Sequence, residues 1–289
     1  GDVGVWAPHL AEVLDRHGLG GGPDPVAGDN PTYPTFLVGD VVVKLFGGTT
    51  SWPAAYAAEL AVQTVLRVDP RIAAPRFLAD GWLHEGAWPY LVTTVMPGTP
   101  VWRAALTADE LRAVVTDIGS QVRRIHRLPH DGVPTDASWS GDLTTALEAS
   151  RLPGHLAAQA EDYVARLEPT DPVVVHADIN DNHVFVAGGR LSGIIDWGDA
   201  VVADRHIEII QIHRSLLDCD RNLLRVFLAA SDWPIGDDFP RRALGQALRR
   251  QALMWAQHQA GDVFEPIAAK FPLPDIGTLD ELAQLLFAV

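Results

Sequence analysis

The stretch from Val173 to Val186, VVVHADINDNHVFV, decides the fold, and LSGIIDWGDA follows it at residues 191–200. β-Branched runs separated by polar or glycine-containing segments are typical of short strands joined by tight turns. The pattern predicts three strands, with a polar loop at residues 179–182 as the first connection and Gly188-Gly189 as the second. The strands are expected at residues 173–175, 184–186 and 191–195.

Two aspartates occupy the ends of these strands. Asp178 lies in the first loop and Asp196 at the end of the third strand, so we expect the two carboxylates to emerge beside each other. Phosphoryl transfer to a hydroxyl needs one carboxylate on the incoming hydroxyl and hard oxygen ligands on Mg²⁺. The arrangement therefore predicts a phosphoryl-transfer site.

The same residues resemble the catalytic segment of the aminoglycoside phosphotransferases and choline kinase-like enzymes, which are relatives of the protein kinases. That group carries an HxDxxxxN loop followed by Asp-Phe-Gly or Asp-Trp-Gly. The resemblance implies an α+β, bilobal protein kinase-like fold. It also implies that Asp178 is the catalytic base, that His176 anchors the loop and that Asp196 is the main Mg²⁺ ligand.

One position departs from this pattern, because His183 stands where the family has asparagine. Imidazole nitrogen is a poorer partner for Mg²⁺ than an amide oxygen, although a neutral imidazole coordinates metals. Three interpretations remain open: His183 binds the metal directly or through water, a shift of the loop brings Asn182 into the site, or the chain is a weak or inactive kinase. We favour His183, because the apolar residues 184–186 keep the rhythm that normally follows the asparagine.

A nucleotide site of this type also needs a strand lysine that holds the phosphates and a helical glutamate that orients it. Lys44 is the single cation in the β-branched run VVVKLF at residues 41–46, where a lysine without a partner is costly. Glu59 follows fifteen residues later in an alanine-rich segment, residues 53–66, which predicts a helix with Pro53 in its first turn. Each feature alone is common, but their order matches the family.

Contacts to the nucleotide are predicted in two further segments. The strand WPYLVTTV runs into Pro97-Gly98, which resembles the linker between the lobes in this family, and Thr94 and Met96 are candidates for holding the adenine ring. Residues 28–35 precede the lysine strand and contain a single glycine. Asn30 and Thr32 are candidate donors to phosphate there, although such residues are equally common in plain turns.

Similarity outside the shared core narrows the predicted substrate. The segments VVVKLFG, GAWPYLVTTVMPGTPVWRAAL, DWGDA and LDELAQLLF resemble hygromycin B phosphotransferases of actinomycete type. The resemblance implies O-phosphorylation of an aminocyclitol antibiotic with ATP, or GTP, and Mg²⁺, and hence resistance. The sequence does not identify the antibiotic, the hydroxyl or the nucleotide. A metabolic kinase for choline, homoserine or a sugar, and a nucleotide-binding pseudokinase, remain alternatives.

The chain is acidic, with 37 Asp and Glu against 22 Lys and Arg and a formal charge of −15. This charge favours a small cationic substrate and disfavours nucleic acid and membrane surfaces as partners. Asp204 is predicted to cap a helix and to brace the catalytic loop. Carboxylates that follow the catalytic segment are candidates for binding ammonium groups. They are Asp199, Glu208, Asp218, Asp220, Asp262 and Glu265.

The length suits two lobes that share a cleft, with a nucleotide-binding N-lobe at residues 1–95 and a largely helical C-lobe at residues 96–289. The single cysteine, Cys219, excludes an internal disulfide. Without an apolar run long enough for a membrane span or signal peptide, we expect a cytoplasmic protein. The oligomeric state is open, and a monomer is compatible with the sequence. Helices are expected at residues 7–17, 53–66, 108–126, 144–148, 154–167, 223–230, 239–259 and 279–287.

Overall fold

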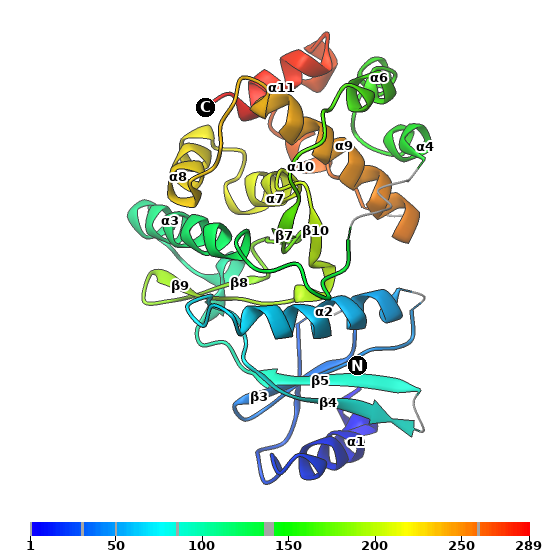
Figure 1. The fold of residues 1–289 in the computed structure, drawn as a ribbon, viewed down its shortest axis with the longest axis vertical. Coiled ribbons are helices and arrows are strands. Elements are labelled where there is room, and N and C mark those ends of the chain that lie inside the picture. The colour runs from blue at the N-terminus through cyan, green and yellow to red at the C-terminus, as the bar shows by residue number, and fades with distance from the viewer. Residues whose placement is uncertain (1, 30–31, 50, 85–86, 136–141, 259–260) are drawn as a thin grey trace.

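The computed structural model describes residues 2–29, 32–49, 51–84, 87–135, 142–258 and 261–289. It has two lobes, one built on an antiparallel sheet and one largely helical (Figure 1). The sheet has the strand order β1-β2-β3-β5-β4. Its strands are β1 (Val26–Ala27), β2 (Thr35–Val38), β3 (Val41–Leu45), β4 (Phe77–Leu83) and β5 (Trp88–Thr94).

Side chains alternate between the two faces of strand β3, and this alternation sets the direction of Lys44. Val41, Val43 and Leu45 are buried on one face, against helix α1 (Val3–Arg16), so the intervening Lys44 points to the opposite face. Helix α2 (Trp52–Leu66) lies on that side, between the sheet and the C-lobe (Figure 1). The period-2 pattern of the strand therefore directs the only cation of β3 toward α2.

Helix α2 belongs to the core of the C-lobe as well as to the N-lobe. Val62, Val65 and Leu66 are buried in the same apolar cluster as the C-lobe helices. Tyr56, earlier in α2, packs with Phe46 in a cluster of the N-lobe. Since both ends of the helix are held by apolar contacts, the position of its buried polar residues is fixed relative to both lobes.

The chain passes from one lobe to the other immediately after β5. The next strand, β6 (Thr99–Pro100), pairs with β8 (Val184–Ala187) of the C-lobe. Gly98 has φ +94°, and a Cβ there would lie 2.0 Å from the carbonyl oxygen of Val186. Only glycine permits both this backbone conformation and this close approach.

The three strands predicted for the catalytic segment are present in the C-lobe, and two of them, β8 and β9 (Arg190–Ile194), form a hairpin. Strand β7 (Val173–Val175) pairs with β10 (Val201–Ala203), and β8 pairs with β9. Strand β7 has the predicted bounds, β8 is one residue longer than predicted, and β9 begins and ends one residue earlier than predicted. Glycines 188 and 189, both with positive φ, make the turn between β8 and β9.

Helices surround these strands, and capping boxes define the starts of two of them, at Thr107 with Glu110 and at Thr278 with Glu281. The helix predicted at residues 154–167 is divided into two short ones. Gln159 lies at the break, where its side chain bonds the backbone of Gly277 and Leu279, a tertiary contact that the sequence pattern does not reveal. The α-helices are α3 (Ala108–Ile125), α4 (Leu143–Glu148), α5 (Gly154–Ala157), α6 (Ala160–Ala165), α7 (Ile207–Gln211), α8 (Arg221–Ser231), α9 (Phe239–His258), α10 (Glu265–Ala268) and α11 (Leu279–Phe287).

Shorter helical turns complete the lobe, and α7 continues directly into a π-helical turn at Ile212–Leu216. The 3₁₀ turns are Val101–Arg103, Trp197–Asp199 and Leu273–Asp275. None of the helices in the described ranges is both long and apolar enough to cross a membrane.

Candidate active site

Lys44 is held between two carboxylates. Its Nζ lies 2.7 Å from Glu59 Oε2 and 2.7 Å from Asp196 Oδ1. Burial would lower the pKa of the ammonium, but the carboxylates of Asp196 and Glu59 outweigh it and raise that pKa above its usual range. The lysine is therefore a permanent cation, at a point where residues from the sheet, α2 and the C-lobe meet.

Asp196 follows β9 in a left-handed conformation, with φ +62°. Such backbone is unfavourable for a residue with a side chain, and it persists only where surrounding contacts impose it. Here the next residue, Trp197, is fully buried and donates from Nε1 to Ile194 O at 3.0 Å. Burial raises the pKa of Asp196, but the Lys44 ammonium reverses this effect and holds it well below its usual range.

His176 makes hydrogen bonds that hold the loop between β7 and β8 in place. Its Nε2 lies 2.9 Å from Ile195 O, and the Asp178 N–H points to its Nδ1 at 3.3 Å. The ring is fully buried, and this burial lowers the pKa of His176 to about 4. A neutral ring that donates from Nε2 and accepts at Nδ1 satisfies both contacts. These two hydrogen bonds therefore tie the His176 ring to the backbone of Asp178 in the loop and of Ile195 after β9.

The second brace of this loop is Glu208. Its carboxylate accepts a hydrogen bond from the backbone N–H of His176, and the residue is fully buried. Burial raises the pKa of Glu208 to about 7. The substrate contact predicted for Glu208 is therefore wrong, because its carboxylate has no accessible surface. Asp204, predicted as brace and cap, instead accepts hydrogen bonds from the backbone and ring of His206 just before α7.

Asp178 has cationic and amide partners that the sequence did not predict. Its Oδ1 accepts from Gln211 Nε2 at 2.7 Å and from Arg250 Nη2 at 2.7 Å, and Arg250 also donates to Ala177 O. Arg214 donates from Nε to Gln211 Oε1 at 2.6 Å, which extends the network. Because Oδ1 already has two donors, Oδ2 is the oxygen of Asp178 that remains available to a substrate hydroxyl.

His183 lies between the two aspartates. Its Nδ1 is 2.9 Å from Asp178 O and 3.3 Å from Asp178 Oδ2, and its Nε2 is 3.4 Å from Asp196 Oδ2. Asn182 is exposed, and its amide points to Asp181 at 3.5 Å. Of the two candidate side chains, the loop therefore brings His183 to Asp196.

Asp199 is the predicted substrate carboxylate that adjoins this cluster. Desolvation raises the pKa of Asp199 to about 6, and the charge of Asp178 adds to this effect. The residue remains exposed, so this desolvation comes from its surroundings and is not complete burial. Such a carboxylate is placed to receive a cationic group of a substrate.

The other four predicted substrate carboxylates are engaged elsewhere or are exposed. Asp218 pairs with Lys270 at 2.6 Å, and Asp220 is the N-cap of α8. Both oxygens of Asp262 accept from backbone N–H groups, at 2.6 and 2.8 Å. Glu265 is an exposed residue at the start of α10. The local bonds of Asp220 and Asp262 favour structural roles over substrate binding.

Most of the residues predicted to bind the nucleotide lie within the described ranges. The N–H of Thr94 donates to Arg76 O, and its Oγ1 accepts from Arg76 N, so the backbone N–H of this residue is not free for adenine. The N–H of Met96 makes no hydrogen bond within the described ranges and is the better candidate. Thr32 is exposed, and Asn30 lies outside the described residues.

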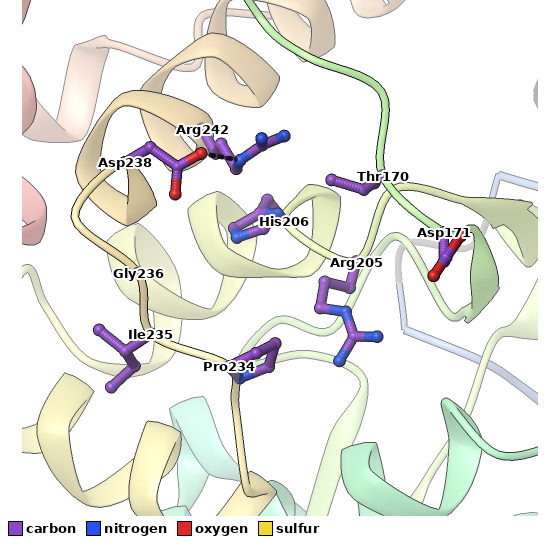
Figure 2. Close-up of a pocket in the computed structure, with 9 residues that line it drawn as sticks. All are labelled: Thr170, Asp171, Arg205, His206, Pro234, Ile235, Gly236, Asp238 and Arg242. Atoms are coloured by element: carbon purple, nitrogen blue, oxygen red, sulfur yellow. Dashed lines mark hydrogen bonds and ion pairs between the residues drawn. The ribbon is translucent and has the colours of Figure 1, made fainter.

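A cavity of the C-lobe lies away from these residues. It measures about 450 Å³, and Figure 2 shows Arg205, His206 and the ion pair between Asp238 and Arg242 along its walls. None of the aspartates discussed above lines it. Cavity volume therefore does not mark the candidate active site, which is defined by its converging charged side chains.

Residues 28–259 match the family described as the phosphotransferase enzyme family, APH. The chain belongs to this family. It is 31% identical over 162 residues to an aminoglycoside 3'-phosphotransferase of Streptomyces fradiae, a match that covers 50% of this chain and 59% of that protein. An aminoglycoside 3'-phosphotransferase of Escherichia coli is 27% identical over 167 residues, or 53% of this chain and 61% of that protein.

The chain thus spans about three fifths of the length of these curated relatives. Among solved structures, the GDP and kanamycin complex of APH(2")-IIIa superposes with a TM-score of 0.70 at 16% identity and covers 91% of this chain and 99% of that one. This similarity establishes that the two chains share the protein kinase-like fold.

The residues around Asp196 fit a metal bound together with a nucleotide. Asp196 Oδ2 and His183 Nε2 converge on one point from two loops. Within the described ranges, no group of three or more His, Cys, Asp or Glu side chains is placed to hold a metal by itself. A cation that keeps several waters and takes phosphate oxygens as ligands needs only one or two protein ligands, as Mg²⁺ does in kinases.

Proposed function

We propose that the protein is an ATP- and Mg²⁺-dependent O-phosphotransferase that acts on an aminocyclitol antibiotic, hygromycin B or a close analogue. The convergence of Lys44, Asp178 and Asp196 at one site carries this proposal. Lys44, oriented by Glu59, binds the phosphates, and the backbone at Met96 contacts the adenine. Asp196 and His183 hold the cation, whose charge neutralises that of the phosphates.

The reaction at Asp178 is a direct in-line transfer. The acceptor hydroxyl donates a hydrogen bond to Oδ2, while Arg250 and Gln211 hold the carboxylate through Oδ1. Asp178 orients the hydroxyl and takes its proton as the new bond to phosphorus forms. Asp199, exposed beside it, receives an ammonium group of the antibiotic. No phosphoenzyme is needed, because donor and acceptor are held at one site.

The test is phosphorylation by the purified chain. With ATP, Mg²⁺ and hygromycin B, we expect a product heavier by one phosphoryl group. Asp178→Asn should lower kcat by about 10²–10⁴-fold with little change in nucleotide affinity, because only a hydrogen-bonding base is lost. Asp218→Asn, at the exposed pair with Lys270, is the matched control and should retain activity. Full activity of Asp178→Asn would show that the assignment is wrong.

A second candidate is a hydroxylated metabolite that carries a carboxylate, such as homoserine. Arg214 donates to Gln211, which in turn donates to Asp178, and it makes no ion pair with a carboxylate of the described residues. A partly buried guanidinium without such a partner favours an acceptor that brings an anionic or carbonyl oxygen. A panel of antibiotics, amino alcohols, hydroxy-amino acids and sugars, measured by ATP consumption, separates the two candidates. ATP binding without turnover on any of them would indicate a pseudokinase.

A further inference from the structure

The tautomer of His183 is determined by the backbone beside it. Nδ1 lies 2.9 Å from the carbonyl oxygen of Asp178, which can only accept a hydrogen bond. The donor Asn180 Nδ2 lies 3.1 Å from Nδ1 and 3.3 Å from the same carbonyl oxygen. Because the contact between Nδ1 and the carbonyl is the shortest of the three, we assign the proton to Nδ1, so that Nδ1 and Asn180 Nδ2 both donate to Asp178 O. In the neutral ring, the lone pair is then on Nε2. Metal-binding histidines typically have this arrangement, with one ring nitrogen bonded to a carbonyl and the other directed at the metal.

The Nε2 lone pair is directed at the cation site. Nε2 lies 3.4 Å from Asp196 Oδ2, whereas Lys44 occupies the other oxygen, Oδ1. Neighbouring ligands of an octahedral cation with bonds of about 2.1 Å lie about 3 Å apart. The separation of these two atoms is close to that value, so a single cation can accept both as ligands after a small adjustment. The His183 side chain is 17% exposed, so a cation can reach it from solvent.

The loop holds His183 in this place through Asn180. Its Oδ1 accepts the backbone N–H groups of Asn182 and His183, at 2.9 and 3.2 Å. Its Nδ2 lies 3.3 Å from Asp178 O. A single buried amide therefore closes the turn and directs His183 inward and Asn182 outward. The imidazole is part of a constrained loop, and exchanging it with Asn182 would require breaking these bonds.

From this geometry we propose that His183 Nε2 binds the nucleotide-bound divalent cation directly and shifts its preference from Mg²⁺ toward Mn²⁺ and Co²⁺. The inference rests on the proposed function, since the cation arrives with the nucleotide. A carboxylate and phosphate site favours hard Mg²⁺, whereas imidazole nitrogen increases affinity along the series from Mn²⁺ to Co²⁺. The position that departs from the family pattern thus becomes the determinant of metal choice.

The experiment uses Mn²⁺ and ADP with the purified chain. Pulsed electron paramagnetic resonance of the complex detects ¹⁴N coupled to Mn²⁺, and protein labelled with ¹⁵N-histidine identifies imidazole as the source. We expect a directly bound histidine signal in the wild type and in Asn182→Ala, the matched control at the neighbouring exposed position. His183→Asn should lose the signal while it still binds Mn²⁺ and ADP, because an amide oxygen replaces the nitrogen.

Calorimetric titration of the ADP complex with Mn²⁺ and with Mg²⁺ gives a second readout. The affinity for Mn²⁺ divided by the affinity for Mg²⁺ should fall by about tenfold in His183→Asn, which is the lower end of the loss expected when histidine ligation of a metal is disturbed. A wild-type complex without histidine coupling, or equal ratios in wild type and His183→Asn, would overturn the inference while the proposed function stands. Failure of the wild type to bind Mn²⁺ and ADP at all would overturn both.

Discussion

The pair formed by Arg250 and Asp178 makes a prediction about stability that does not depend on substrate. Arg250 is 8% exposed and donates to both Asp178 Oδ1 and Ala177 O. Arg250→Met keeps the apolar stem and removes the charge, so that Asp178 loses its partner. Two unit charges about 4 Å apart attract by about 4 kcal/mol at an effective dielectric constant of 20.

Removing one partner of a buried ion pair typically costs about 3–5 kcal/mol, because the other charge stays buried. Asp178 keeps Gln211 and is 17% exposed through its side chain, so the lower end of this range applies. We expect Arg250→Met to lower the free energy of unfolding by about 3 kcal/mol. Asp178→Asn/Arg250→Met should lose about 2 kcal/mol less than the sum of the two single substitutions, because neither charge is then left alone.

Denaturant unfolding of the nucleotide-free wild type, the two single variants and the double variant measures this coupling. Arg190→Met is a matched control, because Arg190 forms an exposed pair with Asp117 and should contribute little. If the losses of the two single variants add to within about 0.5 kcal/mol, the pair is not coupled and the reasoning is refuted.

Three further outcomes follow from the site and the linker. The pKa of Glu208 rises from 4.5 to about 7 on folding, so the contribution of this residue to stability falls as pH rises through this interval. Between pH 5 and pH 8 the unfolding free energy of the wild type should therefore fall by about 2 kcal/mol relative to that of Glu208→Gln. Gly98→Ala should lower the melting temperature, because its Cβ would collide with Val186 O, whereas the same change at the open, exposed Gly154 should not. Lys44→Met should weaken ATP binding measured by calorimetry at least about tenfold, since a charge-assisted phosphate contact is lost, and unchanged affinity would contradict its assignment.

The strands and motifs of the site were predictable because their information is local. The strand Val173–Val175 is an unbroken run of valine, which indicates a buried strand. Lys44, Glu59, Asp178 and Asp196 occur in the order in which the family carries them, each on or beside the predicted element. Register and alternation then direct the side chains to one place. Helix α11 likewise begins at a capping box and runs over the predicted residues.

The partners of the catalytic loop were not predictable in the same way. Gln211 and Arg250 lie 33 and 72 residues beyond Asp178, on helices whose patterns give no sign of the contact. The assignment of the brace failed for a related reason. Asp204 and Glu208 are both acids near the start of α7, and only the fold shows that Asp204 bonds His206 while Glu208 faces the loop.

Net charge was the weakest guide to the chemistry of the site. The formal charge of −15 predicted a cationic substrate, yet the charged groups that contact Asp178 and Asp196 are Lys44 and Arg250. These cations offset the carboxylates before any ligand arrives, so the long-range field of an acidic protein would attract a cationic substrate without selecting it. Selection depends on which group of the acceptor lies beside Asp199 and which beside Arg214. If the acceptor is a polyamine, as we propose, its ammonium groups would meet attraction at Asp199 and repulsion at Arg214, and we expect this asymmetry to orient it.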